Sequence, residues 1–254
     1  MPRAEDFAYL DWPGPIAFAH RGGASEAPEN TLPAFERAVQ LGYRYLETDV
    51  HATADGVLLA FHDHVLDRVT DRTGVIAELP YSVVRAAKVD GIEPIPRFEE
   101  LLASFPDARV NVDAKHDRAV GPLVAAVRRC QALHRVCISA FNDARIARAR
   151  RALPGVCTSM GPTQIARLVA AAHGIPAGRF GAPCAQVPPA QSGFALVTSR
   201  LVAAAHRRGV QVHVWTIDDE AEMTRLLDLG VDGIMTDRPA VLRNVLERRD
   251  QWVA

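Results

Sequence analysis

Two acidic side chains, Glu47 and Asp49, lie two residues apart inside an apolar run of the sequence. Residues with this spacing on a β-strand point to the same face. Two carboxylates about 6 Å apart repel each other by roughly 3 kcal/mol at an effective dielectric constant of 20, so they need a cation, a shared proton or strong hydrogen bonds. Asp113, in a later apolar run, is predicted to add a third oxygen. Three carboxylates without a thiolate favour one divalent cation, Mg²⁺ or Ca²⁺; pairing with arginines is the alternative.

Two histidines stand at the ends of apolar runs and are candidates for proton transfer. His20 ends the first of these runs, and His62 ends a shorter one. Because histidine titrates near physiological pH, one neutral and one protonated ring can act as general base and general acid. The alternative is a hydrogen-bonded structural role, which we expect for most other histidines. His213, two residues before Trp215, is predicted to line the interior of the fold.

Arg21 and Lys115 are the basic residues best placed to hold an anion. Arg21 follows His20, and its guanidinium can grip an anionic oxygen with two hydrogen bonds. Only two of the 29 basic residues are lysines, so Lys115, two residues after Asp113, marks a position that favours a compact charge. The other, Lys88, lies in a polar stretch and is expected on the surface.

These residues belong to a repeating pattern of short apolar runs and amphipathic stretches. The runs, which resemble buried parallel strands, are Pro15–Ala19, Tyr45–Val50, Arg109–Ala114, Val136–Ala140, Val156–Met160, Phe180–Val187, Val210–Ile217 and Gly233–Thr236. The stretches predicted as helices are Leu32–Leu41, Arg97–Phe105, Arg118–Leu133, Ala144–Leu153, Pro162–Ala172, Ser199–Arg208, Glu220–Leu229 and Pro239–Arg248. Eight strands alternating with eight helices predict an α/β fold, the (β/α)₈ TIM barrel. A doubly wound sheet is the alternative, but the glycine-rich turn expected after its first strand is missing.

One segment departs from this pattern. After Gly56 the sequence has an extra strand, Val57–Phe61, and then a polar stretch up to Pro96. We therefore expect a single barrel domain over residues 1–254, with a hairpin and a small insertion of approximately residues 57–95 over one mouth. In such barrels the active site lies at the carboxyl ends of the strands, where the acidic residues and histidines described above fall.

Composition excludes several other classes of protein. The formal net charge of −1 leaves no overall field to attract nucleic acid or an anionic membrane. No apolar run approaches the roughly 18 residues of a membrane-spanning helix, so no stable membrane insertion is expected. Residues 1–10 lack the layout of a signal peptide, and we expect a cytoplasmic protein. Three of the four cysteines lie in or beside apolar runs, which is typical of reduced, packed thiols.

Over nearly the whole chain, from His20 to Pro239, the sequence resembles the glycerophosphodiester phosphodiesterases. The motifs that carry this resemblance are His20-Arg21-Gly22, Pro28-Glu29-Asn30-Thr31, Glu47-Thr48-Asp49-Val50, Thr53-Ala54-Asp55-Gly56, His62-Asp63, Asn111-Val112-Asp113-Ala114-Lys115, Val214-Trp215-Thr216 and Thr236-Asp237-Arg238-Pro239. The resemblance implies a (β/α)₈ barrel with an insertion after the second strand. It also implies hydrolysis of a glycerophosphodiester to glycerol 3-phosphate and an alcohol.

The resemblance further implies a role for each candidate residue. His20 and His62 would be the acid–base pair, and Glu47, Asp49 and Asp113 would hold the divalent cation. Arg21 and Lys115 would contact the phosphate oxygens, and Trp215 would form a wall of the site. One position departs from the family pattern: Asp113 stands where glutamate is common, which shortens the third ligand by one methylene group.

Two other functions remain as alternatives. The first is a phospholipase D-like hydrolysis of lysophospholipids, which an apolar surface around Val75–Val89 would favour. The second is a non-catalytic barrel that binds phosphodiesters, against which the intact pair of histidines argues. Water and the neighbouring glycerol hydroxyl both remain as the first nucleophile, and the acid and the base are not assigned within the histidine pair.

Overall fold

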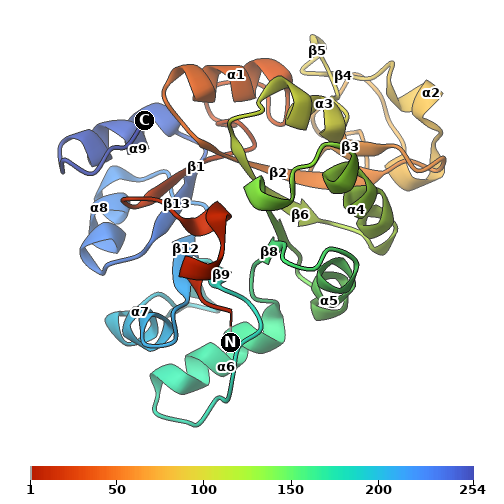
Figure 1. Cartoon of the computed structure of the whole chain (residues 1–254). Helices are drawn as coiled ribbons and strands as arrows, with labels where there is room; N and C mark the ends of the chain where they lie inside the picture. Colours follow the sequence, from red (N-terminus) through yellow and green to blue (C-terminus); the bar gives the residue numbers. More distant parts are fainter. Residues whose placement is uncertain (1) are drawn as a thin grey trace.

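All eight apolar runs form parallel strands that follow one another around a barrel (Figure 1). The computed structural model describes residues 2–254. The strands are β1 (Ile16–His20), β2 (Tyr45–Ala52), β6 (Arg109–Ala114), β7 (Val136–Ser139), β8 (Cys157–Thr158), β9 (Cys184–Val187), β12 (Gln211–Val214) and β13 (Gly233–Thr236). They pair in the order β8-β7-β6-β2-β1-β13-β12-β9. The predicted (β/α)₈ barrel is confirmed.

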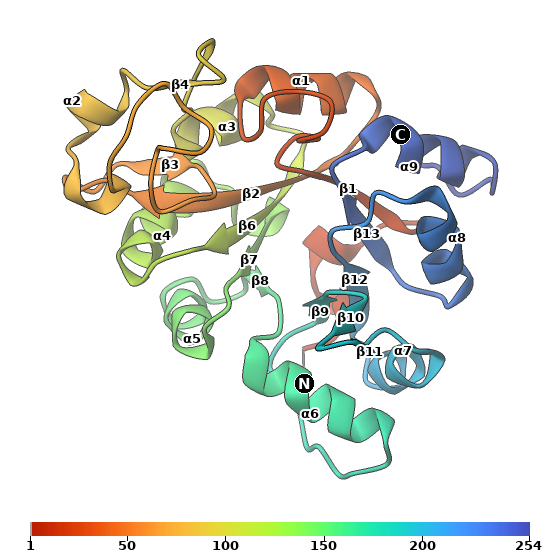
Figure 2. The ribbon, with the colours of Figure 1, turned by 180° about the vertical axis from the view of Figure 1, so that it is seen from behind.

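A ring of helices covers the outside of the strands, as Figure 2 shows from behind. The main helices are α1 (Leu32–Gln40), α3 (Phe98–Ser104), α4 (Val120–Arg129), α5 (Asp143–Ala152), α6 (Pro162–Ala172), α7 (Ser199–His206), α8 (Glu220–Asp228) and α9 (Pro239–Glu247). Side-chain oxygens of Thr31, Asn142 and Asp219 accept backbone N–H groups at the starts of α1, α5 and α8. These caps satisfy donors that a helix leaves free at its first turn.

The barrel has one weak seam, between β8 and β9. Adjacent strands elsewhere are joined by at least two paired positions, but β8 and β9 meet through the isolated bridge Ser159–Cys184. Met160 N donates to Cys184 O at 2.8 Å beside this bridge. The eight-stranded barrel is therefore nearly closed, and its closure depends on very few backbone hydrogen bonds.

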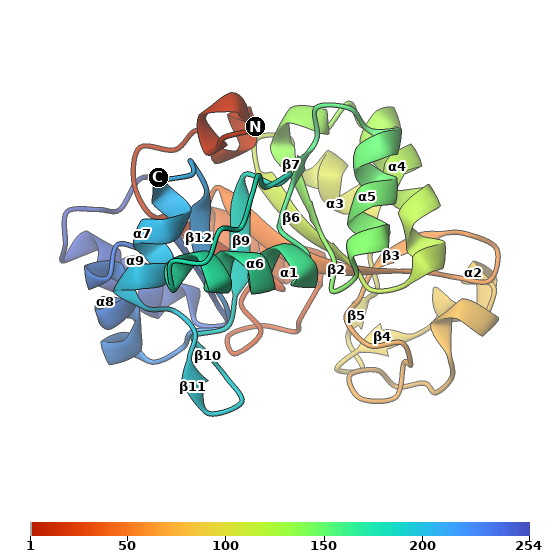
Figure 3. The same cartoon turned by 90° about the horizontal axis from the view of Figure 1, so that it is seen from below.

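The N-terminal segment lies over the amino ends of the strands. It contains the 3₁₀ turns η1 (Ala4–Asp6) and η2 (Ala8–Leu10), and Tyr9 and Leu10 are buried against the barrel. Tyr45 Oη donates to Tyr9 O at 2.7 Å, which fixes the segment to β2. In Figure 3 this segment lies at the opposite end of the barrel from the insertion and from the hairpin of β10 (Ala190–Gln191) and β11 (Phe194–Ala195).

The insertion follows a hairpin in which β3 (Leu58–Ala60) pairs antiparallel with the end of β2. It contains η3 (Ile76–Glu78), α2 (Tyr81–Val84), β4 (Lys88–Val89) and β5 (Glu93–Pro94). Ile76, Val84 and Val89 are buried in a small core of their own, together with Phe61. The apolar side chains of Val75–Val89 thus serve mainly to fold the insertion rather than to form a surface for lipid.

Among residues 2–254, no helix has both the length and the apolar character needed to cross a membrane.

Candidate active site

The carboxyl ends of the strands surround a cavity of about 800 Å³. All eight residues predicted for the site line it: His20, Arg21, Glu47, Asp49, His62, Asp113, Lys115 and Trp215. The register of the sheet explains their meeting, because His20 is paired with Glu47 and Asp49 is paired with Asp113 on adjacent strands. The structure therefore brings the predicted set together, and the role of each residue follows from its contacts.

The turn after β1 brings the backbone of Arg21 to Glu47. Arg21 adopts the left-handed region (φ 52°), and its N–H donates to Glu47 O at 3.0 Å and lies 3.2 Å from Glu47 Oε2. Gly22 follows with φ 83°, and a Cβ atom there would lie 2.8 Å from the Cβ of Ala34. Only glycine fits this turn, which explains the His-Arg-Gly sequence.

The carboxylates of Glu47, Asp49 and Asp113, here called the carboxylate site, are almost fully buried. Lys115 Nζ lies 2.7 Å from Asp49 Oδ1 and 2.8 Å from Asp113 Oδ2, so one ammonium group bridges two of the acids. Asp113 Oδ1 is buried without a hydrogen-bond partner, and Asp49 Oδ2 forms no hydrogen bond but lies 3.3 Å from the guanidinium Nε of Arg21. Buried carboxylate oxygens rarely lack partners, and oxygen donors suit Mg²⁺ or Ca²⁺. The donor types therefore suit a divalent cation, whose binding would require the three carboxylates to draw together and Lys115 to move from between Asp49 and Asp113.

Burial and neighbouring charges shift the pKa values of the three acids in different ways. Burial and repulsion by Asp49 raise the pKa of Glu47 to about 7. Burial would also raise the pKa of Asp49, but Lys115 and Arg21 outweigh it and hold that pKa below its usual value. Burial raises the pKa of Asp113 despite the nearby Lys115. Without a cation, Glu47 is thus the acid that holds a proton most readily.

Each candidate histidine is held by an aspartate. His20 Nδ1 donates to Asp237 Oδ1 at 2.7 Å, and His62 Nδ1 donates to Asp63 Oδ1 at 2.6 Å. An ionised carboxylate can only accept, so the proton lies on Nδ1 and Nε2 of each ring is left for chemistry. His20 Nε2 lies 3.7 Å from Glu47 Oε2. Burial would lower the pKa of His20, but Glu47 and Asp237 together raise it.

A chain of ion pairs ties the barrel to the insertion. Arg21 contacts Glu29 at 3.1 Å, and Arg68 contacts the same carboxylate at 2.7 Å. Arg68 Nε also lies 2.5 Å from Asp63 Oδ2, the carboxylate that holds His62. Glu29 and Arg68 were not predicted as site residues, although they lie in the motifs Pro28-Glu29-Asn30-Thr31 and Leu66-Asp67-Arg68-Val69-Thr70. Their ion pairs connect the carboxylate that holds His62 to Arg21.

The rest of the cavity is divided into an aromatic wall and an apolar wall. Phe141 packs edge-on against Trp215 with ring centroids 5.6 Å apart, and Lys115 Nζ lies 5.7 Å from the centroid of Phe141. On the other side, α6 contributes Ile165 and Val169, the end of β9 contributes Val187, and the neighbouring loops contribute Met160 and Leu196. Phe141 lies in the motif Ser139-Ala140-Phe141 but was not predicted as a site residue. The residues of the apolar wall have no charge by which the sequence could mark them.

Comparison with known proteins identifies the family. The model of the "Glycerophosphoryl diester phosphodiesterase family" matches residues 20–241. A Mycobacterium tuberculosis protein named "Probable glycerophosphodiester phosphodiesterase 2" is 40% identical, over 96% of this chain and 95% of its own. The human "Lysophospholipase D GDPD1" is 26% identical, over 90% of this chain and 85% of its own. A crystal structure of the Agrobacterium tumefaciens glycerophosphodiester phosphodiesterase superposes with a TM-score of 0.73 at 27% identity, covering 90% and 99% of the two chains.

The fold and the site define a barrel enzyme that acts on phosphoric diesters. The chain belongs to the glycerophosphoryl diester phosphodiesterase family, since the match spans almost its full length. It is a phosphoric diester hydrolase, as the resemblance of its motifs implied.

Proposed function

We propose that this enzyme hydrolyses glycerophosphodiesters to glycerol 3-phosphate and an alcohol, with a divalent cation and with His20 and His62 as the acid–base pair. The observation that carries the proposal is the presence of two aspartate-held histidines beside one buried pair of acids. His20 lies next to Glu47, and His62 is close enough to Asp49 to lower its pKa. Proton-transfer groups and a cation site thus share one cavity.

Glu47, Asp49 and Asp113 would hold the cation, which is Mg²⁺ or Ca²⁺ by the oxygen-only donor set. When bound, a divalent cation polarises a phosphoryl oxygen and offsets its developing negative charge. Lys115 now bridges Asp49 and Asp113, so its ammonium group is already at the place where phosphate oxygens must be neutralised. Arg21, which lies on the same cavity, supplies a second positive charge for these oxygens.

The two histidines move the protons. One ring accepts the proton of the attacking hydroxyl group, and the other donates a proton to the oxygen of the leaving alcohol. Asp237 and Asp63 keep the rings oriented and stabilise them when they are protonated. Water and the neighbouring glycerol hydroxyl both fit as the attacking group.

A product assay tests this function directly. Glycerophosphocholine, glycerophosphoethanolamine and glycerophosphoglycerol would be incubated with the enzyme in Mg²⁺, Ca²⁺ or Mn²⁺, and glycerol 3-phosphate would be measured. We expect release that stops on chelation and returns with the cation. The absence of turnover across this panel would overturn the proposal. Tight binding of a diester without turnover would instead support the non-catalytic alternative.

A second candidate substrate is a lysophospholipid, and the apolar wall of the cavity favours it. Ile165, Val169 and Leu196 offer an acyl chain a surface beside the phosphate-binding residues. Phe194, at the tip of the β10–β11 hairpin, is 80% exposed. Turnover of monomeric lysophosphatidylcholines that rises with chain length, and that Leu196→Glu selectively reduces, would establish this activity. A rate independent of chain length would assign the enzyme to the short diesters.

A cytoplasmic location stays a prediction of the sequence.

A further inference from the structure

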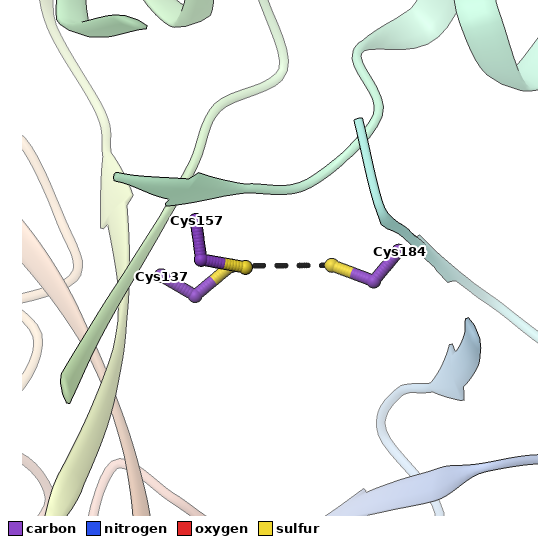
Figure 4. A group of neighbouring side chains, drawn as sticks. All are labelled: Cys137, Cys157 and Cys184. Carbon is purple, nitrogen blue, oxygen red and sulfur yellow. Dashed lines mark hydrogen bonds between the residues drawn. The ribbon is translucent and has the colours of Figure 1, made fainter. Parts of the chain in front are cut away.

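Three cysteines converge inside the barrel, below the active site. Cys137 lies on β7, Cys157 on β8 and Cys184 on β9, and all three are fully buried. The register places Cys137 beside Cys157, while Cys184 pairs across the seam with Ser159. Figure 4 shows the three side chains pointing towards one another from their strands. We call Cys137, Cys157 and Cys184 the sulfur cluster.

We propose that the sulfur cluster is a structural metal site for Zn²⁺ bound by thiolates, separate from the carboxylate site. The three Sγ atoms all lie within 4.8 Å of one another, and those of Cys137 and Cys184 are 4.0 Å apart. Tetrahedral Zn²⁺ with bonds of about 2.3 Å places its sulfur ligands about 3.8 Å apart. The cluster therefore needs only small side-chain movements to bind the ion.

Two polar atoms around the sulfur cluster lack partners. His213 is completely buried, and its Nδ1 has no hydrogen bond. Its Nε2 lies 3.1 Å from Gln211 Oε1 and carries the proton, so Nδ1 presents a lone pair. Metal-binding histidines are commonly held in this way through their second nitrogen. His213 adjoins Cys184 but lies outside the group of ligand atoms within 4.8 Å of one another, so Nδ1 would become the fourth ligand through a movement of the ring towards the sulfurs.

The hydroxyl group of Tyr9 is the second of these atoms. Tyr9 packs in the same apolar cluster as the three cysteines, and its hydroxyl interacts electrostatically with each of them. Neutral thiols are weak acceptors, whereas a metal-bound thiolate accepts a hydrogen bond well. The unpartnered hydroxyl is therefore explained if a neighbouring sulfur is a thiolate.

Positive charge is also available at the sulfur cluster. The Arg150 guanidinium hydrogen-bonds Thr158 Oγ1 at 2.6 Å, next to Cys157, and it interacts with all three sulfurs. This guanidinium would offset the negative charge of thiolates that bind an ion.

The position of the cluster gives the ion a structural task. Cys157 and Cys184 lie on β8 and β9, the two strands joined only by an isolated bridge. A bound ion would tie these strands together across the seam. Because the cluster is enclosed by the barrel, the ion would enter as the chain folds, and binding would add to the free energy of folding.

Cobalt substitution tests the proposal on the full-length protein without mutation. The chain would be unfolded with chelator and reductant and refolded with Co²⁺, which gives sulfur-to-metal charge-transfer absorption only when thiolates bind it. We expect this absorption to reach its maximum at a single equivalent and to be absent when excess Zn²⁺ is present during refolding. A refolded chain that takes up Co²⁺ without the absorption would overturn the proposal. A Cys137–Cys184 disulfide in the purified protein, seen as the loss of two hydrogen masses, would also overturn it.

Matched variants assign the signal to the sulfur cluster. Cys157→Ser and Cys184→Ser should lose the charge-transfer absorption, whereas Cys130→Ser, which removes the cysteine outside the cluster, should keep it. Asp49→Asn should also keep it, because that residue belongs to the carboxylate site. Absorption that vanishes in Asp49→Asn and survives in Cys157→Ser would place the cobalt elsewhere and overturn the proposal.

Discussion

The interior of this barrel contains two layers of buried polar side chains that differ in their donor atoms. At the carboxyl ends of the strands, the carboxylate site faces a cavity that admits substrate. Towards the amino ends, the sulfur cluster packs among Tyr9, Phe18 and Tyr45. The first layer offers oxygen donors and the second offers sulfur donors, so the two layers prefer hard and soft ions respectively.

The two layers share one property, which is that each contains or adjoins buried polar atoms without a hydrogen bond. Among the described residues, six buried side-chain nitrogen or oxygen atoms lack a hydrogen bond. Arg21 Nε, Asp49 Oδ2 and Asp113 Oδ1 belong to the active site, and Tyr9 Oη and His213 Nδ1 adjoin the sulfur cluster. Because Arg21 Nε and Asp49 Oδ2 lie 3.3 Å apart as an ion pair, the atoms that a bound group could satisfy are Asp113 Oδ1 in the first layer and Tyr9 Oη and His213 Nδ1 beside the second.

The largest expected effect comes from removing a charge in the carboxylate layer. Asp49→Asn should lower kcat/KM on the order of 10⁴-fold, because a lost cation removes several kcal/mol of transition-state stabilisation. The melting temperature of the metal-free protein should also fall, since Lys115 and Arg21 lose a buried carboxylate partner and this loss outweighs the relieved repulsion with Glu47. Glycerol 3-phosphate release and thermal unfolding measure the two effects. Glu36→Gln on the surface of α1 is the control, and near wild-type activity in Asp49→Asn would contradict the assignment.

Variants of the two histidines should lose proton transfer while they keep cation binding in the same layer. His20→Asn and His62→Asn should each lower kcat by about 10³-fold, the usual contribution of general acid–base catalysis. Cation binding, measured by calorimetry, should remain close to wild type. His173→Asn, which changes an exposed histidine after α6, serves as the control. If His62→Asn kept its rate, His62 would not be part of the pair.

A smaller effect is expected from pH, which should change the affinity of the carboxylate site for a divalent cation. Because burial and Asp49 raise the pKa of Glu47 to about 7, a cation must compete with a proton there at neutral pH. The folded, metal-free protein holds this proton below pH 7 and loses it above. The affinity for Ca²⁺ should therefore be about tenfold weaker at pH 6 than at pH 8, where one ligand is ionised in most molecules. Calorimetry at both pH values checks this, and a pH-independent affinity would exclude Glu47 as a ligand.

The smallest effect is expected from single cysteines in metal-free protein. Cys157→Ala removes a buried sulfur and should lower stability by about 1 kcal/mol, comparable to the loss of one buried methylene group. Cys130→Ala, at a partly exposed position, should change stability by less than about 0.5 kcal/mol. Urea unfolding in chelator measures both. Equal losses of stability in the two variants would contradict the expected difference between the buried sulfur cluster and Cys130.

The sequence alone predicted the eight strands and the helices between them. The eight residues that it predicted for the site all line one cavity in the structure. Polar residues at the ends of apolar strands stand out, and the bounds of α6 matched the prediction, Pro162–Ala172. The carboxylate partners of the histidines were harder to predict from the sequence, since Asp237 lies 217 residues from His20. The sulfur cluster was interpreted as packed thiols, because residues 137, 157 and 184 have no metal-binding spacing in the chain. Only the order of the strands around the barrel brings these distant positions together.

The chain of ion pairs between Arg21, Glu29, Arg68 and Asp63 makes turnover depend on assembly of two folding units. His20 belongs to the barrel, whereas His62 follows β3 and is held by residues that continue into the insertion, which has its own small core. If His20 and His62 are the acid–base pair, as proposed, a chain whose insertion has not docked would hold only half of that pair. Activity in a refolding mixture would then count completed molecules rather than closed barrels.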